Sequence, residues 1–361
     1  MQRISSILLV FIFSFQLSYA SDDHGQTKEE AFDPGKMIIE HVVDSHEWHI
    51  LSLGDTHVSI PLPIILYSNG KVDVFFSNKF HHGHDVYKGY KLIMESDDAL
   101  AMKLELEEDL KGKIVNVETG EIPLDLSITK NVASMLISMM LICIIFITVA
   151  NGYTKRKGKA PKGLQSVLEP LILFIRDDVA KASIGEKKYE KYLPYLLTIF
   201  FFIFFNNLFG LIPFFPGGAN LTGNIAVTGV LALFTFVITT FSGNKNYWVH
   251  IVNTPGVPWW LKFPVPLMPL VEVMGVFTKP FVLMVRLFAN ITAGHIIVLG
   301  FMSLIFIFGN ISPGIGYGVS VVSVAFSVFM SLLELLVAFI QAYVFTLLSA
   351  LYFGMATEEH H

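Results

Sequence analysis

Long apolar runs alternate with short polar segments over the second two thirds of the chain. The first run, Asn131 to Thr154, has no charged residue over 24 positions, which is enough helix to cross the ~30 Å hydrocarbon core of a bilayer. Two further runs, Tyr192 to Phe215 and Asn224 to Phe241, are separated by a segment rich in Pro and Gly. This pattern predicts three single membrane crossings.

Two much longer apolar segments follow, Val265 to Phe308 and Gly318 to Phe353, with turn-forming residues 309–314 between them. As straight helices they would measure ~66 and ~54 Å at ~1.5 Å per residue. Neither length fits a perpendicular crossing. The helices must therefore be broken, bent at Pro280 or Gly294, or strongly tilted, and the sequence leaves these alternatives open.

The polar segments between the runs indicate which side of the membrane they occupy. Five basic residues and no acidic one follow the first run: Lys155, Arg156, Lys157, Lys159 and Lys162. By the positive-inside rule this loop is cytoplasmic. From Leu164 to Val179 apolar residues recur at helical spacing, which predicts an amphipathic helix that lies on the membrane surface or packs against a soluble partner. In the loop from Ser242 to Phe263, the pair Trp259 and Trp260 indicates interfacial anchoring on the cytoplasmic side.

The N-terminal third has a different character. Arg3, the apolar run Ile7 to Phe15 and the small residues before position 21 are typical of a signal peptide over residues 1–20, because the run is too short for a membrane helix. Residues 21–128 then form an exported domain, and residues 129–361 the membrane domain. Within the exported domain, Val58 to Ile60 and Val72 to Phe76 alternate as strands do, with turn residues 68–70 between them. We therefore expect a small β-containing domain before the first membrane helix.

Composition agrees with this division. Hydrophobic residues make up 53% of the 361 residues and charged ones 15%, against about 25% charged in soluble proteins. Residues 21–130 carry 21 acidic and 10 basic residues, whereas only six charges lie between Tyr192 and Phe353. The balance excludes a basic nucleic-acid binder, and the single cysteine, Cys143, excludes a disulfide scaffold.

The exported domain is also rich in histidine. It holds eight of the twelve histidines, including His81, His82 and His84 beside Asp85. Such a tract could bind a soft divalent metal, but it fixes no coordination geometry, so we expect an exposed polar loop and no metal. The chain has no phosphate-binding Gly-rich loop and no nucleophile–base motif, so we expect neither a cofactor nor an enzyme activity of its own.

Ionisable residues inside the long apolar segments are the strongest functional signal, because charge at membrane depth is costly. If the two segments form an antiparallel hairpin about Pro313 and Gly314, residues whose numbers sum to about 627 lie level with each other. Arg286 is then level with Gln341, and His295 is level with Glu334, ~13 Å further along and on the opposite side of the helix.

These two levels predict two kinds of chemistry. His295 and Glu334 can exchange protons near neutral pH and so form a relay. Arg286 does not deprotonate in a protein, and no acidic residue of this chain is level with it. We therefore expect its counter-ion to be a carboxylate that another subunit presents at mid-membrane depth.

The two long segments carry the motif Lys279-Pro280-x5-Arg286-Leu287-Phe288-Ala289-Asn290-x2-Ala293-Gly294-His295, followed by Glu334-x6-Gln341-Ala342. With this motif, the chain resembles the a subunit of F-type rotary ATP synthases over roughly residues 128–361. The resemblance implies an all-α polytopic protein of about five membrane helices, with a strongly tilted hairpin, in the bacterial inner membrane. It also implies two offset proton half-channels against a ring of c subunits, a stator stalk of b subunits as a further partner, an exported mature N-terminus and a cytoplasmic C-terminus.

The resemblance also implies roles for individual residues. Arg286 matches the arginine that faces the ring carboxylate and blocks a direct proton leak, and Gln341 matches the glutamine beside it. The positions that match polar lining of the channel are Glu272, Asn290, His295, Glu334, Asn207 and Asn224. For the two asparagines, hydrogen bonding between helices is the competing interpretation.

Two features depart from the family pattern. Many members have the acidic residue at the position of His295 and the histidine at that of Glu334, and the exported domain exceeds the short tail common in the family.

Alternative functions are a self-contained ion-coupled transporter, in which Arg286 binds an anionic substrate, and a non-conducting anchor for the exported domain. The sequence does not distinguish H⁺ from Na⁺ as the coupling ion.

Overall fold

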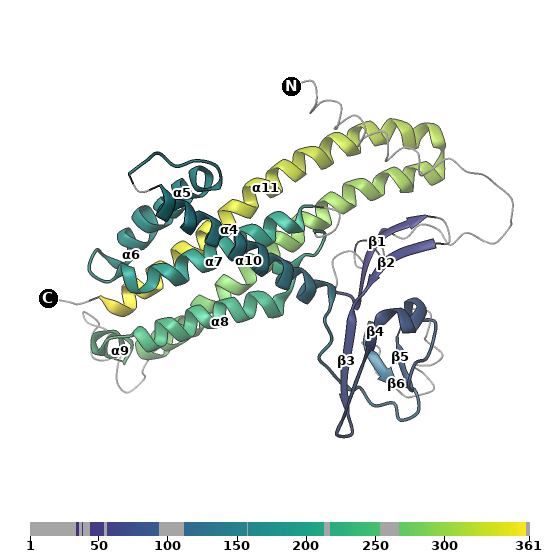
Figure 1. Ribbon diagram of the computed structural model, residues 1–361, viewed down its shortest axis with the longest axis horizontal. Coiled ribbons are helices and arrows are strands. Elements are labelled where there is room, and N and C mark those ends of the chain that lie inside the picture. Colours follow the sequence, from purple (N-terminus) through teal and green to yellow (C-terminus); the bar gives the residue numbers. More distant parts are fainter. Residues whose placement is uncertain are drawn as a thin grey trace.

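The computed structural model describes residues 34–35, 38, 44–53, 56–93, 112–156, 158–212, 217–252 and 267–358. In this part of the chain a bundle of helices joins a smaller module of strands (Figure 1). Five helices are long and apolar enough to cross a membrane: α4 (Lys130–Lys155), α7 (Tyr189–Gly210), α8 (Ile225–Ser242), α10 (Leu267–Ile311) and α11 (Pro313–Thr357). The predicted fold class, five membrane helices with an N-terminal β-containing part, is confirmed. The predicted signal peptide lies outside the described residues.

The helices α10 and α11 form an antiparallel hairpin that extends past the other helices (Figure 1). Each has 45 residues without a break, so each is ~67 Å long at ~1.5 Å per residue. Neither Pro280 nor Gly294 interrupts α10, which excludes a broken helix and leaves bending and tilting as the two ways in which these lengths fit a bilayer.

The connection between α10 and α11 is shorter than predicted. Instead of a loop over residues 309–314, Ser312 alone separates the two helices. Pro313 occupies the first turn of α11, where its missing N–H is not needed. A Cβ at Gly316 would lie 2.7 Å from the Cα of Gly309, so glycine lets the helices meet closely at this tip.

Shorter helices lie between the spans. The segments α5 (Leu164–Phe174), η4 (Ile175–Lys181) and α6 (Ala182–Ile184) follow one another and include the predicted amphipathic helix, with a π-helical middle part. η5 (Leu221–Gly223) precedes α8. The prediction of a loop after α8 was wrong in part, because α9 (Lys245–Val252) is helical; its aromatic and β-branched residues gave no clear helical signal. Trp259 and Trp260 lie outside the described residues.

The strand module contains three small antiparallel sheets. β1 (Glu47–Leu53) pairs with β2 (Thr56–Pro61), and β5 (Tyr90–Leu92) pairs with β6 (Ile114–Asn116). The central sheet has the order β4-β3-β7, with β3 (Pro63–Ser68), β4 (Lys71–Phe76) and β7 (Leu124–Asp125). The predicted turn is confirmed, since Asn69 and Gly70 have φ of 50° and 78°. Ile64, Leu66 and Phe75 pack with Phe80 of η2 (Ser77–Gly83) in the module's core.

The module is joined directly to the first membrane helix. After β7, the N–H groups of Leu126 and Ile128 still donate to carbonyls of β3. Thr129 then caps α4, and the Asp44 carboxylate accepts a hydrogen bond of 3.0 Å from the N–H of Asn131. A carboxylate at a helix N-terminus is stabilising because it satisfies free N–H groups next to the positive end of the helix dipole. Sheet and helix are thus connected without a flexible linker.

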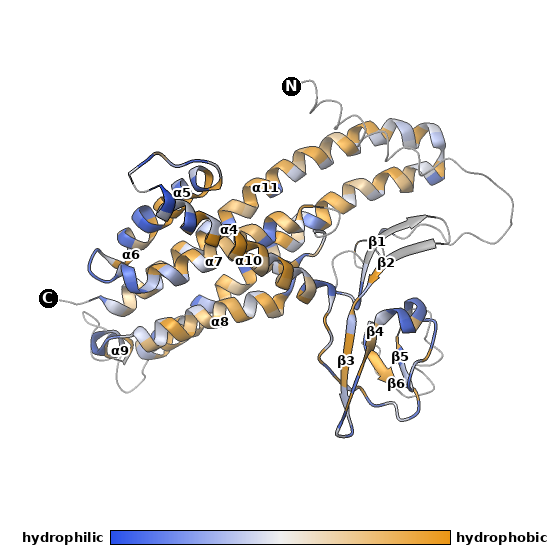
Figure 2. Cartoon of the chain, in the orientation of Figure 1, coloured by the Kyte–Doolittle hydropathy of each residue, from blue (hydrophilic) through white to orange (hydrophobic). Residues whose placement is uncertain are grey.

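The bundle has an apolar interior and a mostly apolar outside (Figure 2). Its core is formed mainly where α7 meets α4 and α11, around Phe200, Phe201 and Phe353, and where α10 packs against α8 and α11. The last turn of α11 is held by Lys188 Nζ and Asn244 Nδ2, which donate to the carbonyl of Thr357 at 2.8 and 3.0 Å. Free carbonyls at a helix C-terminus are commonly satisfied in this way.

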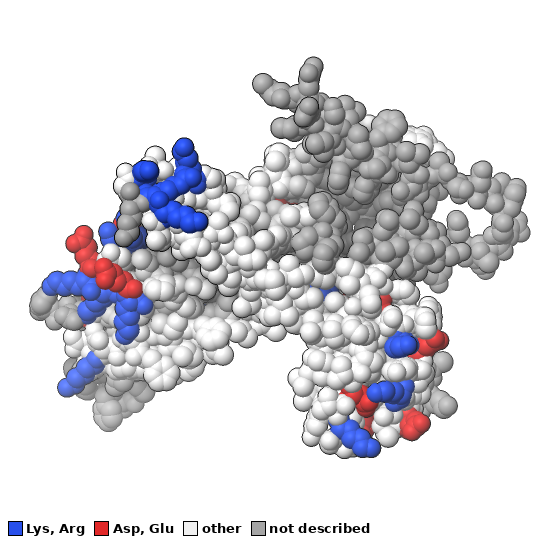
Figure 3. Space-filling view, in the orientation of Figure 1, with Lys and Arg blue, Asp and Glu red and all other residues white. Residues whose placement is uncertain are grey.

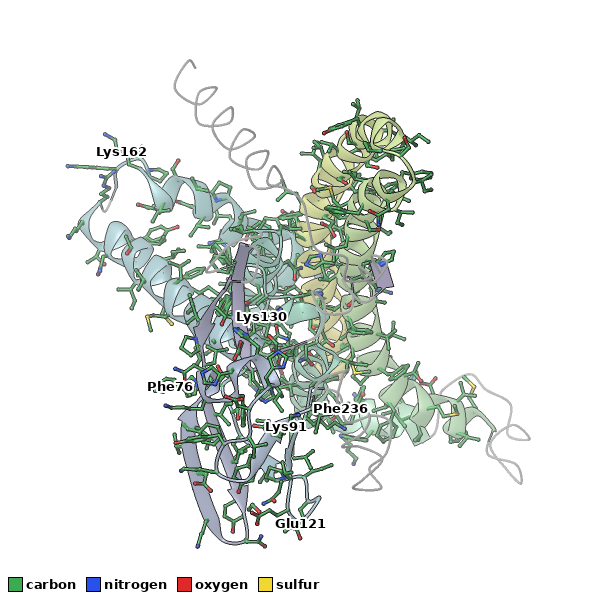
Figure 4. All side chains as sticks on the ribbon, turned by 90° about the vertical axis from the view of Figure 1, so that its right-hand side faces the viewer. Phe76, Lys91, Glu121, Lys130, Lys162 and Phe236 are labelled. Carbon is green, nitrogen blue, oxygen red and sulfur yellow. The ribbon has the colours of Figure 1, made fainter. Side chains whose placement is uncertain are left out.

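Charged side chains gather at the two ends of the molecule (Figure 3). Lys and Arg are concentrated at the end of the bundle that lies away from the strand module, where α4 ends and α5 begins. Figure 4 labels Lys162 in this region. The distribution accords with the predicted cytoplasmic loop, and the side of the membrane remains a prediction.

Candidate functional site

The hairpin brings His295 and Glu334 into direct contact. His295 Nδ1 lies 3.2 Å from Glu334 Oε1, and the two side chains are 19% and 13% exposed. The antiparallel register therefore pairs the two residues as the sequence predicts. An imidazole and a carboxyl group at this distance share a hydrogen bond, with the proton position set by the histidine tautomer.

Two glycines lie against this pair, and one of them, Gly294, makes room for it. A Cβ at Gly294 would collide with the carboxylate of Glu334, so only glycine lets the carboxylate lie against α10 at this point. On the other side of the ring, a Cβ at Gly210 would be 3.5 Å from His295 Nε2. The imidazole therefore lies between α11 and the end of α7, with one nitrogen toward each helix.

Arg286 lies nine residues earlier on α10 and is exposed. Within the described part of the chain no carboxylate forms an ion pair with it. Asn290, one turn further along, is also exposed, whereas Gln341 on α11 is buried. Nine residues make about two and a half turns of a helix, so Arg286 and His295 lie on opposite sides of α10.

The remaining charged residues of α10 lie nearer its beginning. Lys279 Nζ is 5.6 Å from the ring centroid of Tyr352 on α11, a cation–π contact that joins the two helices. Glu272 is half-buried next to α9. Burial and the nearby Glu272 carboxylate raise the pKa of Tyr247, which is the direction that low polarity and a negative charge produce for a phenol.

The predicted channel asparagines have structural partners. Asn207 is buried; its Oδ1 accepts from Thr222 Oγ1 at 2.6 Å, and its Nδ2 donates to the carbonyl of Ala338 at 3.3 Å. It therefore joins α7 to η5 and α11. Asn224 caps α8 through a hydrogen bond from the N–H of Ala226. These bonds fit the interpretation as hydrogen bonding between helices and within a cap.

Three buried oxygens on α7, α10 and α11 have no hydrogen-bond partner among the described residues: Asn206 Oδ1, Thr292 Oγ1 and Ser327 Oγ. Buried polar atoms are generally satisfied by protein or by water. A surface hollow of about 380 Å³ between α10 and α11 is lined by Ser327, Ser331 and apolar side chains, and Ser331 lies one turn from Glu334. These hydroxyl groups were missed in the sequence, because serine and threonine in an apolar helix can bond to their own backbone and give no distinct signal.

The histidine tract of the strand module forms ion pairs instead of one cluster. His81 Nδ1 lies 2.7 Å from Asp85, and His82 Nδ1 lies 2.7 Å from Glu47. Among the described residues no three His, Cys, Asp or Glu side chains are arranged to hold a metal ion.

Fold and site together define a polytopic membrane protein that carries ionisable groups within its spans on a long helical hairpin, as ion-translocating proteins do. A model of the ATP synthase A chain family matches residues 132–354, and a model of a domain of unknown function matches residues 37–131.

Similar curated proteins include ATP synthase subunit a of Chloroherpeton thalassium, which is 47% identical over 245 residues and covers 65% of this chain and 69% of its own. ATP synthase subunit a 2 of Chlorobaculum tepidum is 50% identical over 241 residues, with 64% of each chain covered. The chain thus aligns with about two thirds of the length of these relatives.

The chain belongs to the ATP synthase A chain family. It is accordingly a multi-pass membrane protein of an ATP synthase, and the resemblance inferred from the motif is confirmed. A self-contained transporter is not favoured by these matches.

Proposed function

We propose that this chain is the proton-translocating a subunit of a rotary F-type ATP synthase in a bacterial inner membrane, with Arg286 as the gate and His295 with Glu334 as a proton relay. Family membership supports the class of function. The observation that supports the roles of the residues is the hairpin itself. One side of α10 presents the exposed guanidinium of Arg286, which has no ion-pair partner among the described residues. The opposite side presents the imidazole of His295, paired with the carboxylate of Glu334.

The gate follows from the chemistry of arginine. A guanidinium stays charged at all accessible pH values, and in a medium of low polarity it favours the ionised form of an approaching carboxyl group. We infer that the exposed side of α10 faces a ring of c subunits, each with one carboxyl group at this depth. The carboxyl group gives up its proton when it meets Arg286, and the fixed positive charge keeps a proton from crossing directly between the two half-channels.

The relay connects this meeting point to water on one side. Ser327 and Ser331 in the hollow lie on the same helix as Glu334, and they support a path for water to its carboxyl group. Glu334 exchanges a proton with His295 across 3.2 Å. Glu272, near the beginning of α10, belongs to the second half-channel. Asn290 and Gln341 provide polar groups near Arg286.

The proposal also fixes the topology and the partners. The strand module lies on the exported side and the C-terminus in the cytoplasm, because the basic end of the bundle is expected to stay inside. A stator stalk of b subunits holds the chain against the turning ring. The chain catalyses no reaction alone; it supplies the proton path that the complex couples to ATP synthesis.

The deciding experiment compares ATP-driven acidification of inverted membrane vesicles in the wild type, Arg286→Ala and Lys279→Met. Lys279 is a matched control because it is a cation on the same helix whose described contact is the ring of Tyr352. We expect Arg286→Ala to abolish acidification in complexes that contain a normal amount of the chain, and Lys279→Met to retain it. Acidification that survives in Arg286→Ala would overturn the proposed gate.

A further inference from the structure

The central sheet of the strand module carries large apolar side chains on both faces. Its inner face packs Ile64, Leu66 and Phe75 into the core. The residues between them point the other way, and the strand register pairs Ile65 with Val74 and Tyr67 with both Val72 and Leu124. We call this second surface the outer face; it consists of Ile65, Tyr67, Val72, Val74, Phe76, Leu124 and Leu126. An antiparallel sheet with one face in water normally alternates apolar with polar residues, and this outer face has no polar position.

Among the residues that the structure describes, none covers the outer face, and most of its side chains are exposed. Val72 is 62%, Val74 60% and Leu124 59% exposed. Soluble proteins rarely expose a contiguous apolar patch built from neighbouring strands, and such a patch marks a surface that binds protein or membrane. Something therefore covers it in the assembled protein.

The direct connection to α4 places the outer face beside the bilayer. Leu126 precedes the first residue of α4, Lys130, by four positions, and Leu124 by six. At ~3.3 Å per extended residue, these side chains lie within ~13 and ~20 Å of the point where the membrane helix begins. The hydrogen bonds from Leu126 and Ile128 to β3 fix this distance for the whole sheet.

The orientation of the module agrees with a membrane contact. In Figure 1 the core elements β5 and β6 lie on the far side of β3 from the helix bundle, so the outer face is turned toward the side of the bundle. In Figure 3 the charged side chains of the module gather away from the helices, and the side toward them is uncharged. Figure 4 shows Phe76 at one edge of the module and Lys91 and Glu121 at the other.

The membrane helix that follows the module also exposes apolar side chains. Leu136, Met140 and Ile144 of α4 are exposed, as they are expected to be toward lipid. Tyr67, near the middle of the outer face, is a residue type that prefers the boundary between headgroups and acyl chains, because its ring is apolar and its hydroxyl group is polar.

We infer that the outer face of the β4-β3-β7 sheet lies on the lipid bilayer, at the boundary between headgroups and acyl chains of the leaflet next to the module. The contact needs only that α4 crosses the membrane, so it does not depend on the proposed roles of Arg286 or His295. It holds the module flat against the membrane and gives α4 a second anchor besides its own span.

The test places a fluorescent label on the outer face of the intact complex. In a Cys143→Ser background, Val74→Cys carries the label, and Glu121→Cys is the matched control on the charged side of the same module. The complexes are placed in phosphatidylcholine nanodiscs with or without lipid that carries a nitroxide quencher near the top of its acyl chains. The native Cys143, exposed on α4, supplies the positive control for contact with lipid.

For Val74→Cys we expect the nitroxide lipid to reduce fluorescence about twofold, as for a group buried ~5–10 Å into the boundary, with little change for Glu121→Cys. If the label at position 74 is instead reached by a water-soluble quencher as readily as the label at 121, the inference is overturned. It is equally overturned if the label is protected from both quenchers, because a protein subunit then covers the face. Leu124→Cys repeats the test where Val74→Cys reduces the amount of assembled complex.

Discussion

The contact between His295 and Glu334 makes a quantitative prediction about how the two residues act. If protons pass between them, each residue needs the other. Replacing both should then slow proton pumping less than the product of the two single-variant effects predicts. The substitutions His295→Gln and Glu334→Gln keep a side chain of similar size that can still form hydrogen bonds but does not titrate. A double-mutant cycle over these two positions measures their interaction directly.

The structure sets the size of this interaction. The two groups are 3.2 Å apart and at most 19% exposed, so water screens them little. A hydrogen bond to a charged group contributes ~1.5–3 kcal/mol, and hydrogen bonds between membrane helices average ~0.6 with a maximum of ~1.7 kcal/mol. A coupling of about 1.4 kcal/mol lies between the average for membrane helices and the lower bound for charged groups, and it corresponds to about tenfold in a rate.

The assay is the initial rate of ATP-driven acidification in inverted vesicles, divided by the amount of assembled complex. We expect the double variant to pump about tenfold faster than the product of the two single effects predicts. Effects that multiply to within about twofold would refute the relay, because groups that act independently show no coupling. The rate of ATP hydrolysis by the soluble sector, measured after release from the membrane, controls for damage outside the proton path.

Three further predictions concern other parts of the structure. Gly294→Ala should abolish acidification in assembled complexes, since its Cβ would displace the carboxylate of Glu334; vesicle assays that show normal pumping would contradict this. Asn207→Leu removes two hydrogen bonds between elements and should lower the free energy of unfolding in detergent by about 1–3 kcal/mol, as a shifted denaturation midpoint will show. Partial burial opposes ionisation of Asp125, but hydrogen bonds from His46 and Ser127 outweigh it and lower its pKa below 3.8. The stabilisation from this carboxylate is present above that value and is lost as the pH falls through the lowered pKa. Asp125→Asn should therefore reduce the amide protection of the β3–β7 pair at pH 7 and change it little in acid. Hydrogen exchange on the full chain measures this protection.

The sequence predicted those parts of the fold that depend on one helix or one pair of strands. Uninterrupted apolar runs located α4, α7 and α8 to within about five residues, and the antiparallel hairpin rule paired His295 with Glu334. The sequence did not predict the start of α11, because Gly316 is a turn former in isolation and becomes helical where it packs against Gly309 of the partner helix. A close approach of two helices is a tertiary effect, and no local pattern contains it.

The bonds of Asn207 could not be predicted for a related reason. Its partners Thr222 and Ala338 come from the connection before α8 and from a helix 131 residues further along the chain. An asparagine in an apolar run has the same appearance in the sequence whether it lines a channel or joins two helices. The arrangement of α7 against α11 shows that Asn207 joins these helices, and its place in the channel lining stays a prediction.

The exchange of histidine and acid relative to many family members has a physical consequence for the proposed relay. The hydroxyl groups of the hollow, Ser327 and Ser331, lie on the same helix as Glu334, whereas His295 Nε2 is turned toward the end of α7 at Gly210. A proton that enters by the hollow therefore meets the carboxyl group first and the imidazole second. The double exchange His295→Glu with Glu334→His reverses the order while it keeps the pair, so we expect it to preserve acidification and to shift its pH dependence, a result that a purely structural pair would not give.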